Sequence, residues 1–146
     1  MLLLRQRLLN LGVGLHDPAS GEEVARCESV LGECLHNDLL FILGEVTNGI
    51  DGIGLYALDL LWDATEVSAR NVDMRTLATE TGYYMPFESL QFFGDHQGNG
   101  DLVGLPTLAE PSSSVFLWDH ENDSRTWIAP DIPTYIEWFA ADRIRT

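Results

Sequence analysis

Two apolar runs separated by a turn-forming stretch limit the fold of this chain more than any other feature. Residues 89–93 and 101–105 carry large apolar side chains, and glycine, asparagine and aspartate lie between them. Glycine and asparagine accept positive φ at low cost, so the backbone can reverse there. The pattern predicts a β-hairpin that leaves the side chains of Asp95, His96 and Asp101 at its tip.

A second strand-turn-strand pattern follows the first. Residues 115–118 are apolar, residues 121–124 are polar, and residues 126–128 return to large side chains. We expect a second hairpin here. Two adjacent hairpins predict an antiparallel sheet of at least four strands, and residues 53–58 predict one more strand upstream.

The first part of the chain has helical patterns. Leu4, Leu8 and Leu11 recur at helical spacing, so residues 1–15 are expected to contain a short amphipathic helix. A cleaved signal peptide is the alternative, but the arginines follow the first leucines instead of preceding an apolar core.

The next helix is predicted by a capping box. Ser20 and Glu23 can each satisfy a free backbone donor of the first turn, so a helix is expected from about Gly21 to Gly32. Its apolar positions fall on one face: Val24, Cys27, Leu31 and Cys34.

The two cysteines on that face, Cys27 and Cys34, are the only ones in the chain. Two turns of helix separate them by about 10 Å, which is too far for a disulfide. We expect both to be reduced core residues, and the compartment to be the cytosol.

Further along, Asn37 is expected to cap an interior helix that is apolar on nearly every side and ends at Asn48-Gly49. Residues 60–71 predict a turn and a short helix, and the polar stretch 73–82 predicts a loop or a single helical turn. Pro133 near the first position predicts the start of a last helix after Asp131.

The charge balance restricts the partners. Asp and Glu number 23 against 8 basic residues, all of them arginine, which gives a net charge of −15. Binding to nucleic acid or anionic membranes requires a basic face, so both are disfavoured. A basic protein would be attracted, although solubility alone also explains such a charge.

The length and hydropathy fit one domain, residues 1–146, without a membrane span. The chain is long enough to bury a substantial core. No stretch approaches the roughly 20 consecutive apolar residues that a span requires. We expect a monomer or weak homodimer.

The order of these elements and several short motifs together resemble the SMI1/KNR4 family, also called the SUKH superfamily, over residues 20–142. The matching residues include Asn48 and Gly49 after the second helix, Phe93, Gly94, Asp95, Gly98, Gly100 and Asp101 in the first hairpin, and Trp118 in the strand after it. Leu35-His36 and Asn48-Gly49-Ile50 depart from the family's usual Leu-Pro and Asn-Gly-Gly.

The resemblance implies an α+β fold, a twisted antiparallel sheet flanked by N-terminal helices and a C-terminal helix, and a role in protein binding. Most bacterial members are thought to be immunity proteins that neutralise toxin domains, often nucleases or deaminases. Fungal members regulate cell-wall synthesis and signalling. The family shares no catalytic set, so the resemblance implies no enzyme activity and no cofactor.

The sequence does not predict a catalytic or metal site. An EF-hand beginning at Asp95 fails because Pro106 occupies the position of the bidentate glutamate. The histidines His96 and His120, with nearby aspartates, lack the spacing of a known zinc motif. A hydrolase that uses these hairpin residues remains the alternative.

Two acidic clusters are the candidate partner-binding residues. Trp62 is the expected exposed aromatic anchor of the first, while Trp118, Trp127 and Trp138 are expected mostly in the core. The first cluster is Asp59, Trp62, Asp63 and Glu66, and the second is Asp119, Glu121 and Asp123.

Overall fold

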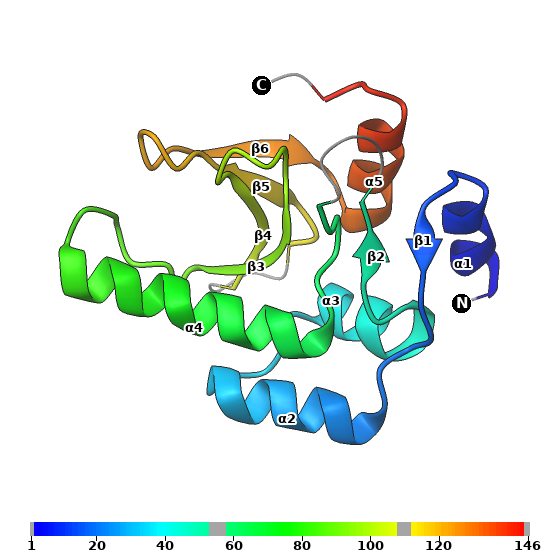
Figure 1. The fold of residues 1–146 in the computed structure, drawn as a ribbon, viewed down its shortest axis with the longest axis horizontal. Coiled ribbons are helices and arrows are strands. Elements are labelled where there is room, and N and C mark those ends of the chain that lie inside the picture. Colours follow the sequence, from blue (N-terminus) through cyan, green and yellow to red (C-terminus); the bar gives the residue numbers. More distant parts are fainter. Residues whose placement is uncertain (1, 53–57, 108–111, 145–146) are drawn as a thin grey trace.

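The computed structural model describes residues 2–52, 58–107 and 112–144, which form an α+β fold (Figure 1). Its elements are α1 (Leu2–Leu9), β1 (Gly14–Leu15), α2 (Gly21–Leu31), α3 (Asn37–Phe41), the π-helical turn η1 (Ile42–Val46), β2 (Ile50–Asp51), α4 (Ala64–Thr81), β3 (Leu90–Asp95), β4 (Leu102–Pro106), β5 (Val115–Trp118), β6 (Arg125–Ala129) and α5 (Ile132–Ala140).

Both predicted hairpins are present, and they form one four-stranded antiparallel sheet in the order β3-β4-β5-β6. Phe92 pairs with Gly104, and Leu102 pairs with Trp118. The prediction of a four-stranded antiparallel sheet is confirmed. The small β1-β2 ribbon lies apart from this sheet, between it and α1 (Figure 1).

The first hairpin differs from expectation at its tip. Gly98 and Gly100 do take positive φ, of 76° and 100°. However, His96 is fully buried and Asp101 is only 6% exposed, so their side chains do not project from the tip. His96 Nδ1 lies 2.8 Å from the buried Tyr135 hydroxyl. The exposed part of the turn is residues 97–100.

Two adjacent phenylalanines of β3 pack against two different aromatic groups of the core. Phe92 contacts Phe87 and Trp118, with ring centroids 5.3 and 6.0 Å away. Phe93 makes an edge contact with Tyr135 of α5, at 6.1 Å. Through these two neighbouring rings, at a register shift between Phe92 and Gly94, β3 joins the two parts of the core.

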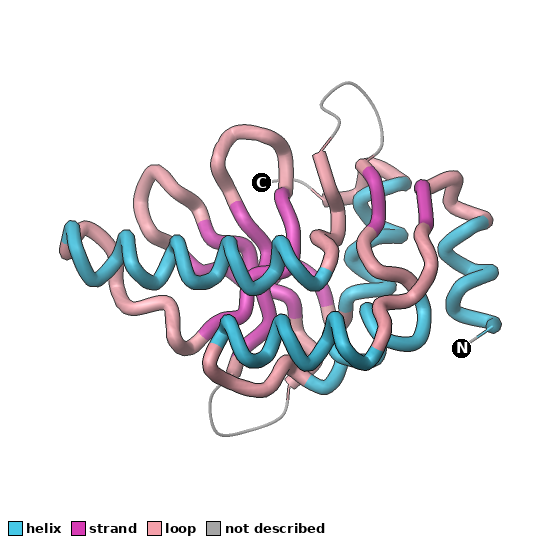
Figure 2. The backbone as a smooth tube through the Cα atoms, turned by 60° about the horizontal axis from the view of Figure 1, so that its bottom comes forward, coloured by secondary structure: helices cyan, strands magenta, loops and turns pink. Residues whose placement is uncertain are grey.

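The segment 64–81 corrects the prediction of a short helix followed by a loop, because it is one helix, α4. Asp63 caps its first turn by accepting from the Glu66 amide at 2.8 Å, and Gly82 ends it in the left-handed conformation. The pattern was missed because the buried face has small and polar residues in place of a leucine stripe. These are Ala64, Val67, Ser68, Asn71 and Ala78. Figure 2 shows α4 and α2 side by side across the strands.

The helix predicted from the capping box is confirmed. Ser20 and Glu23 make both bonds of the box, and Gly32 ends α2 with a φ of 79°. The helix therefore stops before Cys34, which is exposed, while Cys27 is buried. The expectation that Cys34 is a core residue on the same helical face was wrong.

The second predicted helix is shorter and less enclosed than expected. His36, not Asn37, is the N-cap of α3, since its ring accepts from the Asp38 amide at 3.1 Å. Leu40 and Phe41 are 38% and 40% exposed, so the helix is not apolar-packed on every side. Thr47 in extended conformation ends η1.

The first 15 residues contain the expected helix and also a strand that was not predicted. After α1, Gly14 and Leu15 pair with Asp51 and Ile50. The expected strand at 53–58 lies outside the described residues, except Leu58, which is not in a strand.

The last helix, α5, begins as predicted. Asp131 is its N-cap and accepts from the Thr134 amide at 2.8 Å. Ile132, Tyr135 and Ile136 are fully buried. This helix contacts β6 on one side and α1 on the other, near the β1-β2 ribbon (Figure 1).

Candidate functional site

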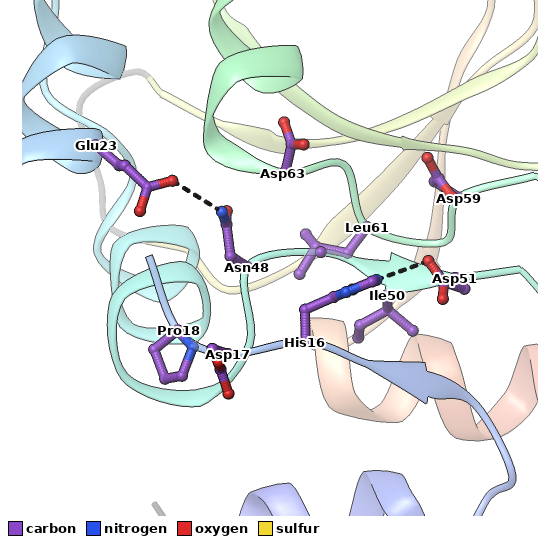
Figure 3. A pocket seen from close by; sticks show the side chains of 11 residues that line it. His16, Asp17, Pro18, Glu23, Asn48, Ile50, Asp51, Asp59, Leu61 and Asp63 are labelled. Atoms are coloured by element: carbon purple, nitrogen blue, oxygen red, sulfur yellow. Dashed lines mark hydrogen bonds and ion pairs between the residues drawn. The ribbon is translucent and has the colours of Figure 1, made fainter. Parts of the chain in front are cut away.

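A pocket of about 490 Å³ opens where the β1-β2 ribbon meets the start of α4 (Figure 3). Among the described residues that line it, His16 is the one group that can carry positive charge. Five of the lining residues are carboxylates: Asp17, Glu23, Asp51, Asp59 and Asp63. We call this feature the acidic pocket.

Asn48 connects the segments that surround the pocket. Its side-chain oxygen accepts from the Ala64 amide at 2.8 Å, and its own amide donates to the Asp17 carbonyl at 2.9 Å. Its side-chain nitrogen lies 3.4 Å from Glu23 (Figure 3). Asn48, which the sequence predicts at the end of a helix, therefore links the start of α4 to the segment before α2.

The backbone conformation beside Asn48 favours glycine. Gly49 has a φ of 105°, which strains any other residue. Ile50 in turn donates to Leu61 at 2.9 Å, so the floor of the pocket is fixed by backbone bonds.

The electrostatics of the pocket follow from its excess of carboxylates. Burial, and then the negative charges of Asp51 and Asp95, raise the pKa of Asp59. The hydrogen bond to Asp51, 2.8 Å long, raises the pKa of His16 (Figure 3). The negative charge of neighbouring carboxylates adds to both shifts, after burial for Asp59 and after the hydrogen bond for His16.

The structure brings two residues of the first predicted cluster to the pocket. Asp59 and Asp63 line it, and Glu66 lies one turn into α4, where Arg70 is 3.5 Å away. Burial, and then the charge of Asp59, raise the pKa of Glu66.

Trp62 corrects the expectation of an exposed anchor, because it is fully buried. Its amide donates to the Phe93 carbonyl at 2.8 Å, so residues 59–62 run along the edge of β3. Its indole Nε1 donates to Asp95 at 2.9 Å, and the Arg70 guanidinium lies 4.4 Å above its ring. The side chain holds this edge together and is not available to a partner.

This close edge contact also explains the Phe-Gly-Asp motif. A Cβ on Gly94 would lie 2.2 Å from the Leu60 carbonyl oxygen, so a side chain there would push residues 59–62 away from the sheet. The Asp95 carboxylate, from the last residue of the motif, accepts from Trp62 Nε1 at 2.9 Å and from Arg70 at 3.4 Å.

The second acidic cluster has mixed roles. Glu121 is exposed, and the Asp119 side chain accepts from the Glu121 amide at 2.8 Å within the turn. The Asp123 carboxylate is used within the fold. It accepts from Trp118 Nε1 at 2.7 Å, from the Met85 amide at 2.8 Å, and from Arg125 at 3.1 Å.

One set of side chains has the donor types of a metal site. Ligand atoms of Asp101, Asp119 and His120 lie within 4.8 Å of one another. His120 already donates its backbone amide to Asp101 at 3.1 Å, and its Nδ1 lies 2.7 Å from the same oxygen. Burial would raise the pKa of the Asp101 carboxyl, but the bonds from His120 and Asn99 hold it below its usual range. This network gives Asp101 and His120 a structural role, and the expected absence of a metal stays a prediction.

His96 does not join that set. Its ring points to Tyr135, and its Nε2 has no hydrogen-bond partner among the described residues. The histidine pair considered for hydrolysis is therefore divided between a buried core position and a hairpin turn.

Comparison with known protein families identifies the fold. A family model described as SMI1-KNR4 cell-wall, of the SUKH group, matches residues 22–136. The chain therefore belongs to the SMI1/KNR4 family, which includes toxin immunity proteins. No curated protein matches the chain. None of the helices in the described part of the chain has both the length and the apolar character that a membrane span requires.

Proposed function

We propose that this chain is an immunity protein that binds and neutralises the toxin domain of a bacterial polymorphic or contact-dependent toxin system. The toxin domain is a basic protein, a nuclease or a deaminase. The protein acts by stoichiometric binding without turnover. The acidic pocket is the single observation that carries this proposal beyond family membership.

The charge of the chain supports a basic partner. The net charge is −15, and five carboxylates converge on one pocket. A surface of one sign steers an oppositely charged partner and speeds association, most strongly at low ionic strength. Nucleases and other enzymes that bind nucleic acid need a basic face, which the acidic pocket complements.

The position of the pocket also supports an interface role. Its walls are fixed by hydrogen bonds at Asn48 and Ile50, while three of its carboxylates, Asp17, Asp51 and Asp63, are exposed. Such a site is pre-organised, so little ordering of the chain is required on binding. Asp59 and Asp63, which line the pocket, and Glu66 beside it are proposed as the first partner contacts, and Glu121 and Asp119 as a second acidic surface.

The test is protection of cells. Cells that express the toxin domain encoded beside this gene should survive when this chain is co-expressed, and the two proteins should purify as one complex. The matched control replaces the two pocket acids by Asp59→Asn and Asp63→Asn. Asparagine also caps helices, so α4 is kept. Death of cells that co-express the wild-type chain, with no complex, would refute the proposal.

The second candidate is a regulatory or scaffold module with an endogenous partner. The cell-wall description of the matched family favours it. In that case the partner is encoded elsewhere, and protection against the neighbouring toxin does not depend on this chain. Purification of the tagged chain from its native host would then recover a cellular protein in place of a toxin domain.

A further inference from the structure

A second, smaller pocket lies between α1, α3 and the start of α5, with a volume of about 280 Å³. Its apolar wall is formed by Leu4, Phe41, Ile42 and Pro133, and two carboxylates, Asp38 and Asp131, also line it. We call it the anchor pocket. It has a different character from the acidic pocket, whose lining is mostly polar and carboxylate.

The carboxylates of the anchor pocket carry charge that the fold does not neutralise. Neither Asp38 nor Asp131 forms an ion pair with a described residue. Arg7 interacts electrostatically with Asp131, but its guanidinium forms an ion pair with Glu137. One oxygen of Asp131 accepts from the Thr134 amide as the N-cap of α5. The Asp38 carboxylate and the second oxygen of Asp131 therefore remain available to an incoming cation beside the apolar wall.

The histidine next to this pocket does not supply that cation. His36 Nδ1 accepts from the Asp38 amide at 3.1 Å, and its Nε2 lies 2.7 Å from the Ser112 carbonyl oxygen. One nitrogen accepts and the other donates, which assigns a neutral imidazole. The same bonds fix the start of α3 against the segment that leads into β5.

The wall of the pocket is held in place. The Arg7 Nε donates to Glu137 at 3.0 Å, which attaches α1 to α5. Arg5 donates to the His16 carbonyl at 2.8 Å and to the Val46 carbonyl at 2.6 Å. Within this fixed frame, Phe41 stays 40% exposed although it is a large apolar residue.

We propose that the anchor pocket receives an arginine or lysine side chain of the basic protein partner. The aliphatic stem contacts Phe41 and Leu4, and the cationic head binds Asp38 and Asp131. Long basic side chains combine an apolar stem with a charged head, which matches an apolar wall with carboxylates. The partner's identity as a basic toxin domain rests on the function proposed above, but the pocket's chemistry does not.

The first test needs no toxin. The full chain, labelled with ¹⁵N, is titrated with Nα-acetyl-arginine methylamide and, in parallel, Nα-acetyl-lysine methylamide. The neutral controls are Nα-acetyl-citrulline methylamide and Nα-acetyl-norleucine methylamide. We expect saturable shifts of the Phe41 and Ile42 amides with a cationic probe, and about fivefold weaker binding of the neutral probes. Comparison of the two cationic probes tells whether arginine or lysine is preferred.

A variant separates this pocket from the general negative charge. Asp38→Asn with Asp131→Asn should abolish the shifts at Phe41 and Ile42, while shifts near the acidic pocket remain. Asparagine is also a good N-cap, so α5 stays folded. Shifts confined to the acidic pocket, or equal binding of the neutral probes, would overturn the inference.

The second test uses the toxin domain encoded beside the gene. Phe41→Ser should increase the dissociation rate about tenfold or more, as expected for a hot-spot aromatic, while Leu40→Ser on the same helix should not. If the wild-type complex forms and Phe41→Ser leaves its dissociation rate unchanged, the anchor pocket is refuted and the immunity function stands. If no wild-type complex forms, the immunity function fails, and the probe titration decides the pocket alone.

Discussion

The side-chain amide of Asn71 binds both backbone polar groups of Phe92. Its Nδ2 donates to the Phe92 carbonyl at 2.8 Å, and its Oδ1 accepts from the Phe92 amide at 2.8 Å. Asn71 is only 1% exposed. The Asn71 side chain therefore satisfies the backbone hydrogen-bonding groups of Phe92, as a neighbouring strand would. The contact joins α4 to the sheet.

Replacing this amide should destabilise the fold. Asn71→Ala leaves the Phe92 donor and acceptor buried and unpaired, so we expect a loss of about 2–4 kcal/mol in the free energy of unfolding. Urea denaturation measures it. The control is Asp73→Ala on the exposed side of the same helix, which should change stability by no more than about 0.5 kcal/mol. Equal effects of the two variants would show that Asn71 is not a structural link.

The second prediction concerns the buried indole. Trp62→Phe removes the Nε1 donor to Asp95 and leaves a cavity beneath Arg70, so a loss of about 2–4 kcal/mol is expected. Trp127 offers a matched control because it is 50% exposed. Trp127→Phe should cost less than about 1 kcal/mol. If the two variants melt at the same temperature, Trp62 does not hold the β3 edge.

His96 should titrate at a lower pH than His16 and His120. Burial lowers the pKa of His96, while the bonds to Asp51 and Asp101 raise the pKa of His16 and His120. In an NMR titration of the ring C–H signals, His96 should therefore change charge at the lowest pH of these three. A His96 signal that titrates above the His16 and His120 signals would contradict its buried, neutral state.

The lowered pKa of His96 also makes the free energy of unfolding depend on pH. Unfolded histidine binds a proton below about pH 6.5, whereas folded His96 stays neutral until its lowered pKa is reached. The unfolded state then binds more protons, so the His96 contribution to stability falls as the pH drops from about 6.5 toward that pKa. His96→Gln should lack this loss of stability. Urea denaturation of both proteins, at several pH values from about 6.5 downward, measures the difference. Parallel pH profiles of wild type and variant would contradict it.

Much of the fold was predictable from local patterns, and the largest departure, helix α4, has a physical cause. The hairpins, the capping box at Ser20 and the start of α5 depend on a few neighbouring residues, so the sequence alone indicates them. Helix α4 was missed because Ser68 and Asn71 occupy buried positions where a pattern search expects apolar residues. Asn71 is accepted there because the backbone of Phe92 pairs with both ends of its side-chain amide, in addition to the Val67 carbonyl of its own helix. The contact with Phe92 is distant in the sequence, so no local pattern reveals it.

The site was less predictable for a similar reason. Asp59 and Asp63 were candidates because they lie near each other in the sequence. Asp17 and Asp51 join them in the pocket only through the β1-β2 ribbon and the bonds of Asn48. Trp62 was misassigned because the polar residues beside it suggested an exposed loop, whereas residues 59–62 lie along the edge of β3.

We expect Asp59, Asp63 and Glu66 of the first acidic cluster to account for most of the electrostatic steering of the toxin domain. The combined substitutions Asp59→Asn, Asp63→Asn and Glu66→Gln should lower the association rate with the toxin domain about tenfold at low salt, measured by stopped flow. The difference should nearly vanish above about 0.5 M salt because the charges are screened. The control pair Asp119→Asn and Glu121→Gln should have the smaller effect. A wild-type association rate that does not change with salt would refute steering.

The most direct test of the central claim is a titration of toxin activity with this protein. A fixed concentration of the purified toxin domain is mixed with increasing amounts of the chain, and the remaining enzymatic activity is measured. Neutralisation by tight binding predicts a linear fall in activity that ends at a fixed stoichiometric ratio and does not change with longer incubation. Activity that persists at large excess, or that disappears with time at a small fraction of that ratio, would contradict neutralisation by stoichiometric binding.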